Sequence, residues 1–427
     1  MYTPLSLRKN FLWTFTGNTV KAASTWGIIA MLVKMGGTVM VGKFELGRAI
    51  AVPLMAITML QLRAIQVTDA RGEYSFADYL GTRLFMTILG VVAFVIIAWR
   101  WYSGETAWVI LLWGLAVSIE SVSDIVRGLF QRYERMNLSG TSMVIKGLAS
   151  IVTAGALIWL TGRLTEAIAG IVVIYLLVLF LYDFPKAYHL LAYKSAAENI
   201  PRQIMPRFNV KITLALLWLA LPLGIVYFSG SLQSSIPKLI LESYHGEVAL
   251  GYFGPIVYPV MLGALIVSAM GQSAAPRLAN YYINNLTAYC HLMRKLFLLA
   301  LGMGLLFVGS VAVFGKFVLR VLYTADYANY HTEFIILGVG AAMAFISFFF
   351  GYGLTSARVF RRQLLIAIVT CLVAIIMAYL LIPLYGLRGT AITFTATSFT
   401  KLTCCFITLL WIIRKRRREI NIRAIEQ

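Results

Sequence analysis

The groups in this sequence that could act on a substrate are cations inside long apolar stretches. Lys21 lies near the middle of residues 10–35, a stretch long enough to cross a bilayer, which takes about 20 residues. An ammonium at that depth costs about 2.5–3.5 kcal/mol on insertion scales. At helical spacing, Asn18 and Lys21 lie on one polar stripe. The stripe favours a cation facing a water-filled path for an anion, although a lysine that snorkels or pairs with a buried carboxylate is the alternative.

The last apolar stretch mirrors the first, because Lys401 lies deep within it on a stripe rich in threonine. Arg48 lies near the outer end of the second apolar stretch, and Arg63 lies at its inner end. A cationic interior suits a large anion such as a pyrophosphate headgroup. The predicted substrate-binding residues are Lys21, Asn18, Arg48, Arg63 and Lys401.

Carboxylates in or beside the apolar stretches could couple transport to an ion or act as a gate. Glu120 and Asp124 share a helix face, and Arg127 lies about one turn further on. Two carboxylates close together in a low dielectric repel, which suits a proton or cation site. The alternative is that Arg127 and the lipid headgroup region pair with both carboxylates and give them only a structural role. Asp69, close to Arg63 at the inner mouth, is either a gate latch or part of an ordinary interfacial charge cluster.

No hydrolytic or group-transfer motif is present, since HExxH, GxSxG, Walker and CxxC patterns are all absent. The four histidines do not pair at metal-ligand spacing, and the four cysteines fall in or beside apolar runs. We therefore expect no catalytic residue, no metal and no cofactor. Any function must use the polar groups within the spans.

Composition places the chain among membrane proteins. Hydrophobic residues make up 60%, and the mean hydropathy is +0.81. The pattern predicts an all-α polytopic protein with about twelve transmembrane helices. These apolar segments fall near residues 11–34, 44–64, 80–99, 106–126, 141–161, 166–183, 210–229, 248–272, 295–315, 334–355, 364–383 and 388–413.

The net charge of +20 follows the predicted topology. With the N-terminus inside, most Lys and Arg residues fall in the inner connections, which places both termini in the cytoplasm. This spread is unlike the single basic face of a nucleic-acid-binding protein, so no nucleic-acid partner is expected. The basic run 414–418 is interpreted as an anchor that, with the inner loops, contacts anionic lipids.

The two halves of the chain resemble each other. Gly42-x-x-x-Leu46-Gly47 opens the second segment, and Gly246-x-x-x-Leu250-Gly251 opens the eighth. Proline follows in each, so we expect helix breaks at Pro53, Pro255 and Pro259. The proline-containing connection 184–209 separates the halves, which predicts six-helix bundles at 1–208 and 209–427.

Residues 60–83 (LQLRAIQVTDARGEYSFADYLGTR) and 124–137 (DIVRGLFQRYERMN) resemble the polysaccharide-repeat flippases of O-antigen type, in the multidrug/oligosaccharidyl-lipid/polysaccharide exporter superfamily. The resemblance implies alternating access, with two bundles moving an undecaprenyl-pyrophosphate-linked oligosaccharide to the outer leaflet of the bacterial cytoplasmic membrane. It implies a role in O-antigen, capsule or exopolysaccharide assembly, beside polymerase or glycosyltransferase machinery. Charged residues of the first, second, seventh and eighth spans line the family's cavity, which carries over to Lys21, Arg48 and Arg63. The seventh and eighth spans here lack Lys and Arg inside, which leaves open whether Lys401 serves instead.

Two other functions stay open at this point. A cation-coupled multidrug exporter of the same superfamily should favour buried carboxylates, and Lys21 and Lys401 argue against it. A membrane-embedded polysaccharide polymerase typically needs a sizeable outer loop or clustered acids outside. The predicted outer loops are short, so this second alternative is disfavoured.

Overall fold

A computed structural model describes residues 5–69, 72–194 and 204–425, and these are almost entirely helical with no strand among them. The predicted all-α class is therefore confirmed. The chain forms two compact units, Met1–Ser235 and Ile236–Gln427, which divide within one long helix. We call them the N-terminal and C-terminal units and describe each by itself. The functional division predicted between residues 208 and 209 stays a prediction.

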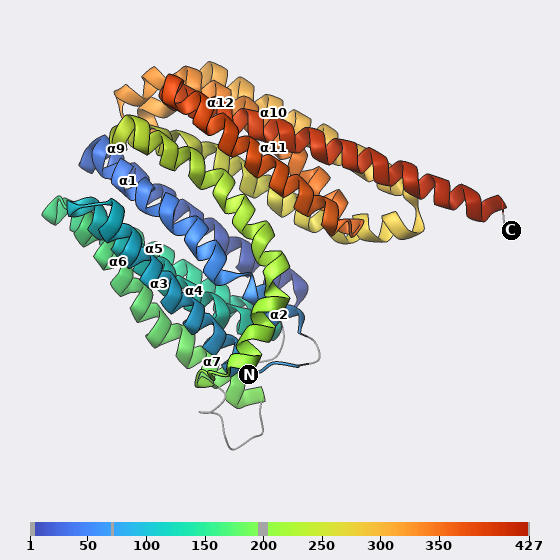
Figure 1. The fold of residues 1–427 in the computed structure, drawn as a ribbon, viewed down its shortest axis with the longest axis horizontal. Coiled ribbons are helices and arrows are strands. Elements are labelled where there is room, and N and C mark those ends of the chain that lie inside the picture. Colours follow the sequence, from blue (N-terminus) through green and yellow to red (C-terminus); the bar gives the residue numbers. More distant parts are fainter. Residues whose placement is uncertain (1–4, 70–71, 195–203, 426–427) are drawn as a thin grey trace. The chain divides into compact units, whose positions relative to one another are not determined.

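The N-terminal unit is a bundle of antiparallel helices in which α1 packs along α5 and α4, and α3 packs on α4 (Figure 1). Its elements are α1 (Leu7–Met59), α2 (Leu62–Thr68), α3 (Phe76–Trp101), α4 (Gly104–Arg132), α5 (Met136–Thr161), α6 (Leu164–Val178), the π-helix η1 (Leu179–Asp183), α7 (Phe184–Lys194) and the first part of α9 (Val210–Asn284).

The C-terminal unit contains the rest of α9 and three further long helices, with α11 packed between α10 and α12. Its other elements are α10 (Leu286–Leu322), the 3₁₀-helix η2 (Ala325–Tyr330), α11 (His331–Ser356) and α12 (Phe360–Ile425).

Three of the long helices are broken at a glycine. Gly37 in α1 has φ 75° and ψ 177°, Gly246 in α9 has φ 77° and ψ 176°, and Gly386 in α12 has φ 53°. Only glycine adopts such angles without steric cost, because it has no Cβ. The breaks in α1 and α9 thus lie at glycines, whereas Pro53 and Pro255 lie within helical stretches, as does Pro259. Proline fixes φ near the helical value, so a helix can continue through it despite the lost hydrogen bond.

Gly37 and Gly246 have matching backbone angles, and aligning the two halves of the chain on them gives a register different from the one predicted from the sequence. Residues 37–44 (GTVMVGKF) and 246–253 (GEVALGYF) share the pattern Gly-x-Val-x-x-Gly-x-Phe, with the first glycine at the break in both. The sequence alone had suggested pairing Gly42 with Gly246. The structural register differs from it by five residues, because Gly42 now pairs with Gly251.

Two buried tyrosines satisfy the backbone where the prolines of α9 interrupt hydrogen bonding. Pro255 lacks an N–H, which frees the carbonyl of Gly251 four residues earlier, and Tyr327 donates its hydroxyl to that oxygen at 3.0 Å. Pro259 likewise frees the carbonyl of Pro255, and Tyr323 donates to it at 2.8 Å. The segment from the end of α10 into η2 therefore fixes the proline-containing part of α9.

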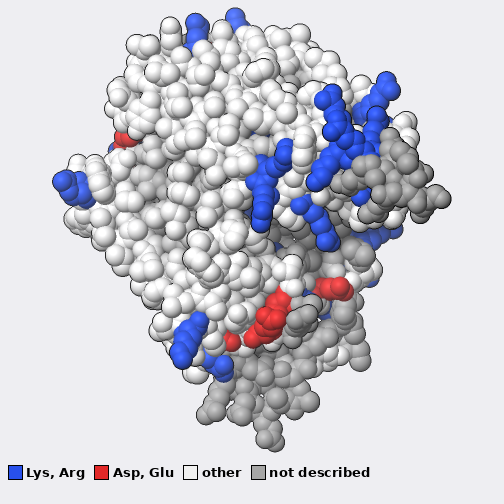
Figure 2. All heavy atoms as spheres, turned by 45° about the vertical axis from the view of Figure 1, so that its right-hand side comes forward, with Lys and Arg blue, Asp and Glu red and all other residues white. Residues whose placement is uncertain are grey.

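The surface is that of a multi-pass membrane protein. Nine helical stretches among the described residues are long and apolar enough to cross a membrane. Large apolar side chains such as Trp218 and Leu306 are mostly exposed, as suits contact with lipid. Figure 2 shows one face on which broad uncharged areas separate groups of Lys and Arg side chains.

Exposed tryptophans gather at one end of the N-terminal bundle. Trp99 and Trp101 end α3, and Trp108 lies at the start of α4 with its ring 6.2 Å from that of Trp99. Trp159 lies at the end of α5, which runs in the same direction as α3. Tryptophan is enriched at membrane–water interfaces, so this end of the bundle is assigned to an interface.

Candidate functional site

A buried set of ionic side chains lies within the N-terminal unit and joins six of its elements. We call it the charge cluster. It consists of Lys21 of α1, Arg63 of α2, Arg83 of α3, Glu120, Asp124 and Arg127 of α4, Lys146 of α5 and Asp183 of η1.

Glu120 is the centre of the cluster because three cations share its carboxylate. Lys21 donates to one oxygen, and Nη2 of Arg127 lies 2.9 Å from the same atom. Nζ of Lys146 lies 3.1 Å from the other oxygen. A carboxylate this poorly exposed is stable only when it is paired and hydrogen-bonded, and Glu120 has more cations than its charge requires.

Asp124 gathers the cations of the neighbouring helices. Nη1 of Arg63 donates to it at 3.0 Å, and Nη2 of Arg127 lies 3.5 Å away. Nη2 of Arg83 lies 3.8 Å from its second oxygen. Arg63 also donates to the side chain of Gln131 from Nη2 at 2.8 Å and from Nε at 3.2 Å, so three hydrogen bonds from Arg63 hold α2 against α4.

Lys146 and Asp183 form the most deeply buried pair, with side chains 3% and 0% exposed. Their charged atoms lie 3.2 Å apart, and Lys146 also donates to the hydroxyl of Ser123 at 2.5 Å. Asp183 is the last residue of η1, where the π-helical turn changes the register of the helix face. The pair links the fifth and sixth apolar segments to the rest of the cluster.

Small residues bring α1 and α5 close enough to form the cluster. A Cβ added at Gly140 would lie 2.6 Å from the carbonyl oxygen of Trp13, and one at Gly147 would lie 2.9 Å from the hydroxyl of Ser24. Membrane helices commonly pack through such small residues. This packing carries Lys21 and Lys146 to opposite oxygens of Glu120.

The cluster contains five cations and three carboxylates, a formal excess of two positive charges. Among its described atoms, five are buried without a hydrogen-bond partner: Nε and Nη1 of Arg127, Nε and Nη2 of Arg83, and Oδ1 of Asp183. Lys21 and Arg63 are its most open members, with side chains 36% and 27% exposed. The cluster can therefore receive an anion at its open cations without leaving a carboxylate unpaired.

The structure brings together Lys21 and Arg63 with the three charged residues predicted in the fourth segment, Glu120, Asp124 and Arg127. For that segment it favours the interpretation in which Arg127 contacts both carboxylates. Their predicted role in ion coupling stays a prediction.

Three predicted substrate residues lie outside the cluster. Asn18 is on α1 and exposed. Arg48 is in the part of α1 after the break and donates to Glu45 at 2.9 Å. Lys401 belongs to the C-terminal unit, where its ammonium lies 5.3 Å from the ring centre of Phe348. No described carboxylate forms an ion pair with Lys401.

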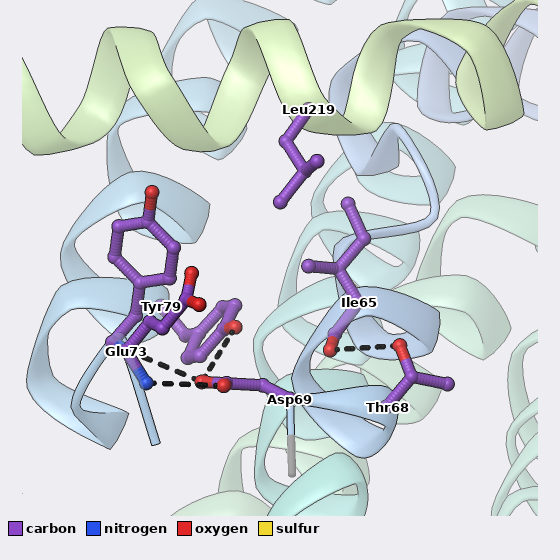
Figure 3. Close-up of a pocket in the computed structure, with 7 residues that line it drawn as sticks. Ile65, Thr68, Asp69, Glu73, Tyr79 and Leu219 are labelled. Carbon is purple, nitrogen blue, oxygen red and sulfur yellow. Dashed lines mark hydrogen bonds between the residues drawn. The ribbon is translucent and has the colours of Figure 1, made fainter. Parts of the chain in front are cut away.

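Asp69 organises the loop between α2 and α3 (Figure 3). Its carboxylate accepts hydrogen bonds from the N–H groups of Glu73 and Tyr74 at 3.0 and 3.2 Å. It lines a cavity of about 310 Å³ with Tyr79 and Leu219, among others. Burial raises the pKa of Asp69, but the two N–H groups and the Arg132 guanidinium outweigh it and hold that pKa below its usual value. The contacts are those of a loop anchor, and the predicted gating role stays a prediction.

Sequence reasoning missed Arg83, Lys146 and Asp183. Each lies within about two turns of an end of its apolar segment, where a charged residue is readily assigned to the adjoining inner loop. The available signal was that Lys146 and Asp183 both lie inside predicted segments, at 141–161 and 166–183, and have opposite charge. A pair of opposite charges in two adjacent spans is itself an indication of contact.

The chain as a whole is similar to known proteins. A family model described as "Polysaccharide biosynthesis protein" matches residues 7–282. The chain is 24% identical over 395 residues to the capsular polysaccharide biosynthesis protein CapF of Staphylococcus aureus, covering 92% of this chain and 97% of CapF.

Solved structures with the same fold include two transporters. An inward-facing MATE family multidrug resistance transporter of the MOP superfamily matches with a TM-score of 0.72 at 14% identity, covering 98% of this chain and 97% of its own. The lipid II flippase MurJ in an inward closed conformation matches with a TM-score of 0.70 at 12% identity, covering 97% and 93%. At this identity the likeness concerns the fold alone.

Proposed function

Since the chain belongs to the polysaccharide biosynthesis protein family, we propose that it is a flippase for a lipid-linked oligosaccharide. The resemblance noted at residues 60–83 and 124–137 is confirmed at the level of the family. In the proposed reaction, an undecaprenyl-pyrophosphate-linked repeat unit passes from the inner to the outer leaflet of the bacterial cytoplasmic membrane by alternating access. The glycan would then enter O-antigen, capsule or exopolysaccharide assembly beside polymerase or glycosyltransferase machinery.

The observation that carries the proposal is the sharing of Glu120 among three cations. When a pyrophosphate oxygen binds Lys21, Glu120 keeps Arg127 and Lys146 as partners. The exchange therefore avoids the large penalty of leaving a buried charge unpaired. Arg63 is the second open cation and offers a guanidinium, which binds phosphate oxygens in a bidentate way.

The proposed topology has twelve spans with both termini in the cytoplasm. The breaks at Gly37, Gly246 and Gly386 would each divide one long helix into two spans. The basic C-terminal run supports an inner interface there, since Trp411 packs against Arg362 and Lys415, with the Arg362 guanidinium 3.4 Å from the ring centre. Anionic lipids are the proposed partners of this segment.

Lys401 is proposed as the contribution of the C-terminal unit to substrate binding. An ammonium over an aromatic ring is held by a weaker interaction than an ion pair, so it stays available to an anion. A cation-coupled multidrug exporter is the weaker alternative, because the cluster's carboxylates are already occupied by its own cations.

The experiment is a sidedness assay for undecaprenyl-linked glycan in inverted membrane vesicles, comparing wild type with Lys21→Ala and Lys401→Ala. We expect each variant to insert normally and to lower the initial flipping rate at least tenfold. The matched control is Lys43→Ala. Lys43 is on α1 like Lys21, and its ion pair with Glu105 of α4 lies outside the charge cluster, so this variant should flip normally. Normal flipping by both variants would move the substrate site away from the lysines, and no flipping by wild type would overturn the proposal.

A further inference from the structure

A separate pocket with charged and aromatic side chains in its lining lies in the C-terminal unit, at the place where two broken helices meet the start of α11. It has a volume of about 400 Å³, within the range of small-ligand sites. The lining residues with polar or aromatic side chains are His245 of α9, Tyr330 of η2, Glu333 of α11, and Tyr385 and Arg388 of α12.

The pocket exists because of the helix breaks. His245 directly precedes the break at Gly246, and the break at Gly386 is part of the lining. Nε2 of His245 lies 2.8 Å from the carbonyl oxygen of Ile382, four residues before Gly386. A carbonyl only accepts, so Nε2 carries a proton and donates this hydrogen bond. This hydrogen bond ties α9 to α12 at the pocket.

The pocket offers donors, acceptors and aromatic rings together. Nε of Arg388 lies 3.3 Å from Glu333, which leaves both Nη groups without a partner among the described residues. Glu333 is largely buried and keeps acceptor capacity on its second oxygen. Tyr385 is 57% exposed, so its ring is accessible to a ligand.

We propose that this pocket binds a pyranose ring of the exported glycan. Glu333 accepts from sugar hydroxyls, Arg388 donates to hydroxyl or carboxylate oxygens, and the tyrosine rings pack on the apolar faces of the sugar. The inference rests on the proposed function and extends it, because the charge cluster addresses the pyrophosphate and this pocket addresses the glycan. In the proposed topology it lies on the outer side, where the glycan is released.

The test is saturation-transfer NMR on the full chain in lipid nanodiscs, with methyl α-glucoside and methyl α-glucuronide as separate probes. We expect transfer to the ring protons of at least one glycoside, and a loss of at least fivefold in Tyr385→Ala and Arg388→Gln. A preference for the glucuronide that Arg388→Gln removes would assign the free Nη groups to a sugar carboxylate. The matched control is Tyr379→Ala, an equally exposed tyrosine of α12 outside the pocket, which should keep the full signal.

Absence of transfer to both glycosides in wild type, or equal transfer in all variants, would overturn the pocket assignment. The flipping assay of wild-type vesicles is run in parallel. If the wild type flips the glycan but binds neither glycoside, this inference alone is rejected. If the wild type does not flip the glycan, the proposed function on which the inference rests is rejected.

Discussion

The two units stabilise polar groups within apolar helices in different ways. The N-terminal unit gathers eight ionic side chains into one cluster around Glu120 and Asp124. The C-terminal unit satisfies free carbonyls of α9 with the hydroxyls of Tyr323 and Tyr327, and holds Lys401 over an aromatic ring. The contacts at the centre of the N-terminal unit are thus ionic, whereas those that fix α9 in the C-terminal unit are neutral hydrogen bonds.

The difference indicates a division of roles. A shared ion pair can exchange one partner for a ligand while the remaining partners hold the carboxylate, so the cluster is suited to binding and release. A hydroxyl bound to a proline-freed carbonyl has one geometry and no spare partner, so it fixes the shape of a helix. We therefore expect substitutions in the cluster to affect stability according to how deeply each residue is buried.

The largest expected effect is at the most buried pair. Lys146→Ala leaves Asp183 without its cation, and breaking a buried pair from one side costs about 3–5 kcal/mol. We expect a marked fall in the thermal unfolding midpoint of the protein in detergent. Lys21→Ala should change that midpoint less, because Glu120 keeps Arg127 and Lys146 as partners and no buried charge is left unpaired.

The control for this prediction is the double variant Lys146→Met/Asp183→Leu, which removes both charges. It should recover much of the lost stability, because no unpaired charge is left. Equal midpoints for Lys146→Ala and Lys21→Ala would contradict the ranking by burial.

The next effect concerns the glycine breaks. Gly246→Ala forces a side chain into a left-handed conformation, a strain of about 1–3 kcal/mol, although nothing lies within 4 Å of the added Cβ. We expect a lower unfolding midpoint, and a similar result for Gly37→Ala. Gly230→Ala is the matched control, since that glycine is also in α9 and has open space but no positive φ. An equal loss in the control would assign the effect to something other than backbone strain.

The tyrosine caps are tested by a double-mutant cycle. Tyr327→Phe leaves the carbonyl of Gly251 unsatisfied, which costs about 1–3 kcal/mol. In a Pro255→Ala background the backbone N–H returns, so the same substitution should cost clearly less. Unfolding midpoints of the four proteins give the coupling. Additive effects would show that the hydroxyl and the proline act independently.

The smallest expected effect is at Asp69. Its folded pKa lies below the ordinary value of 3.8, so its stabilisation is complete above that pH and is lost as the pH falls through the folded pKa. On acidification through this range the amides of Glu73 and Tyr74 should lose protection, measured as the ratio of the intrinsic exchange rate of each amide at that pH to its observed rate. In Asp69→Asn the protection factors of these two amides should be low throughout and should not change with pH over this range. An unchanged profile would show that the carboxylate does not anchor the loop.

The sequence by itself determined the helical class, the membrane character and part of the cluster. Continuous apolar runs of about 20 residues have the length of membrane helices, in which every backbone group is satisfied within the segment. The i,i+4 spacing of Glu120 and Asp124 placed both on one face, with Arg127 next along it. Lys21 stood out because a cation within a span needs an explanation.

Only the tertiary structure decided which charges pair and where the helices break. Lys146 and Asp183 lie near the ends of their apolar segments along the chain, but the packing of α5 and the π-turn of η1 bury Lys146 between Asp183 and Glu120. Proline indicated which helices are interrupted, but the breaks lie at Gly37 and Gly246, because a positive φ combined with an extended ψ strains any residue that has a Cβ. Ion pairing depends on distances between helices, which local spacing does not contain.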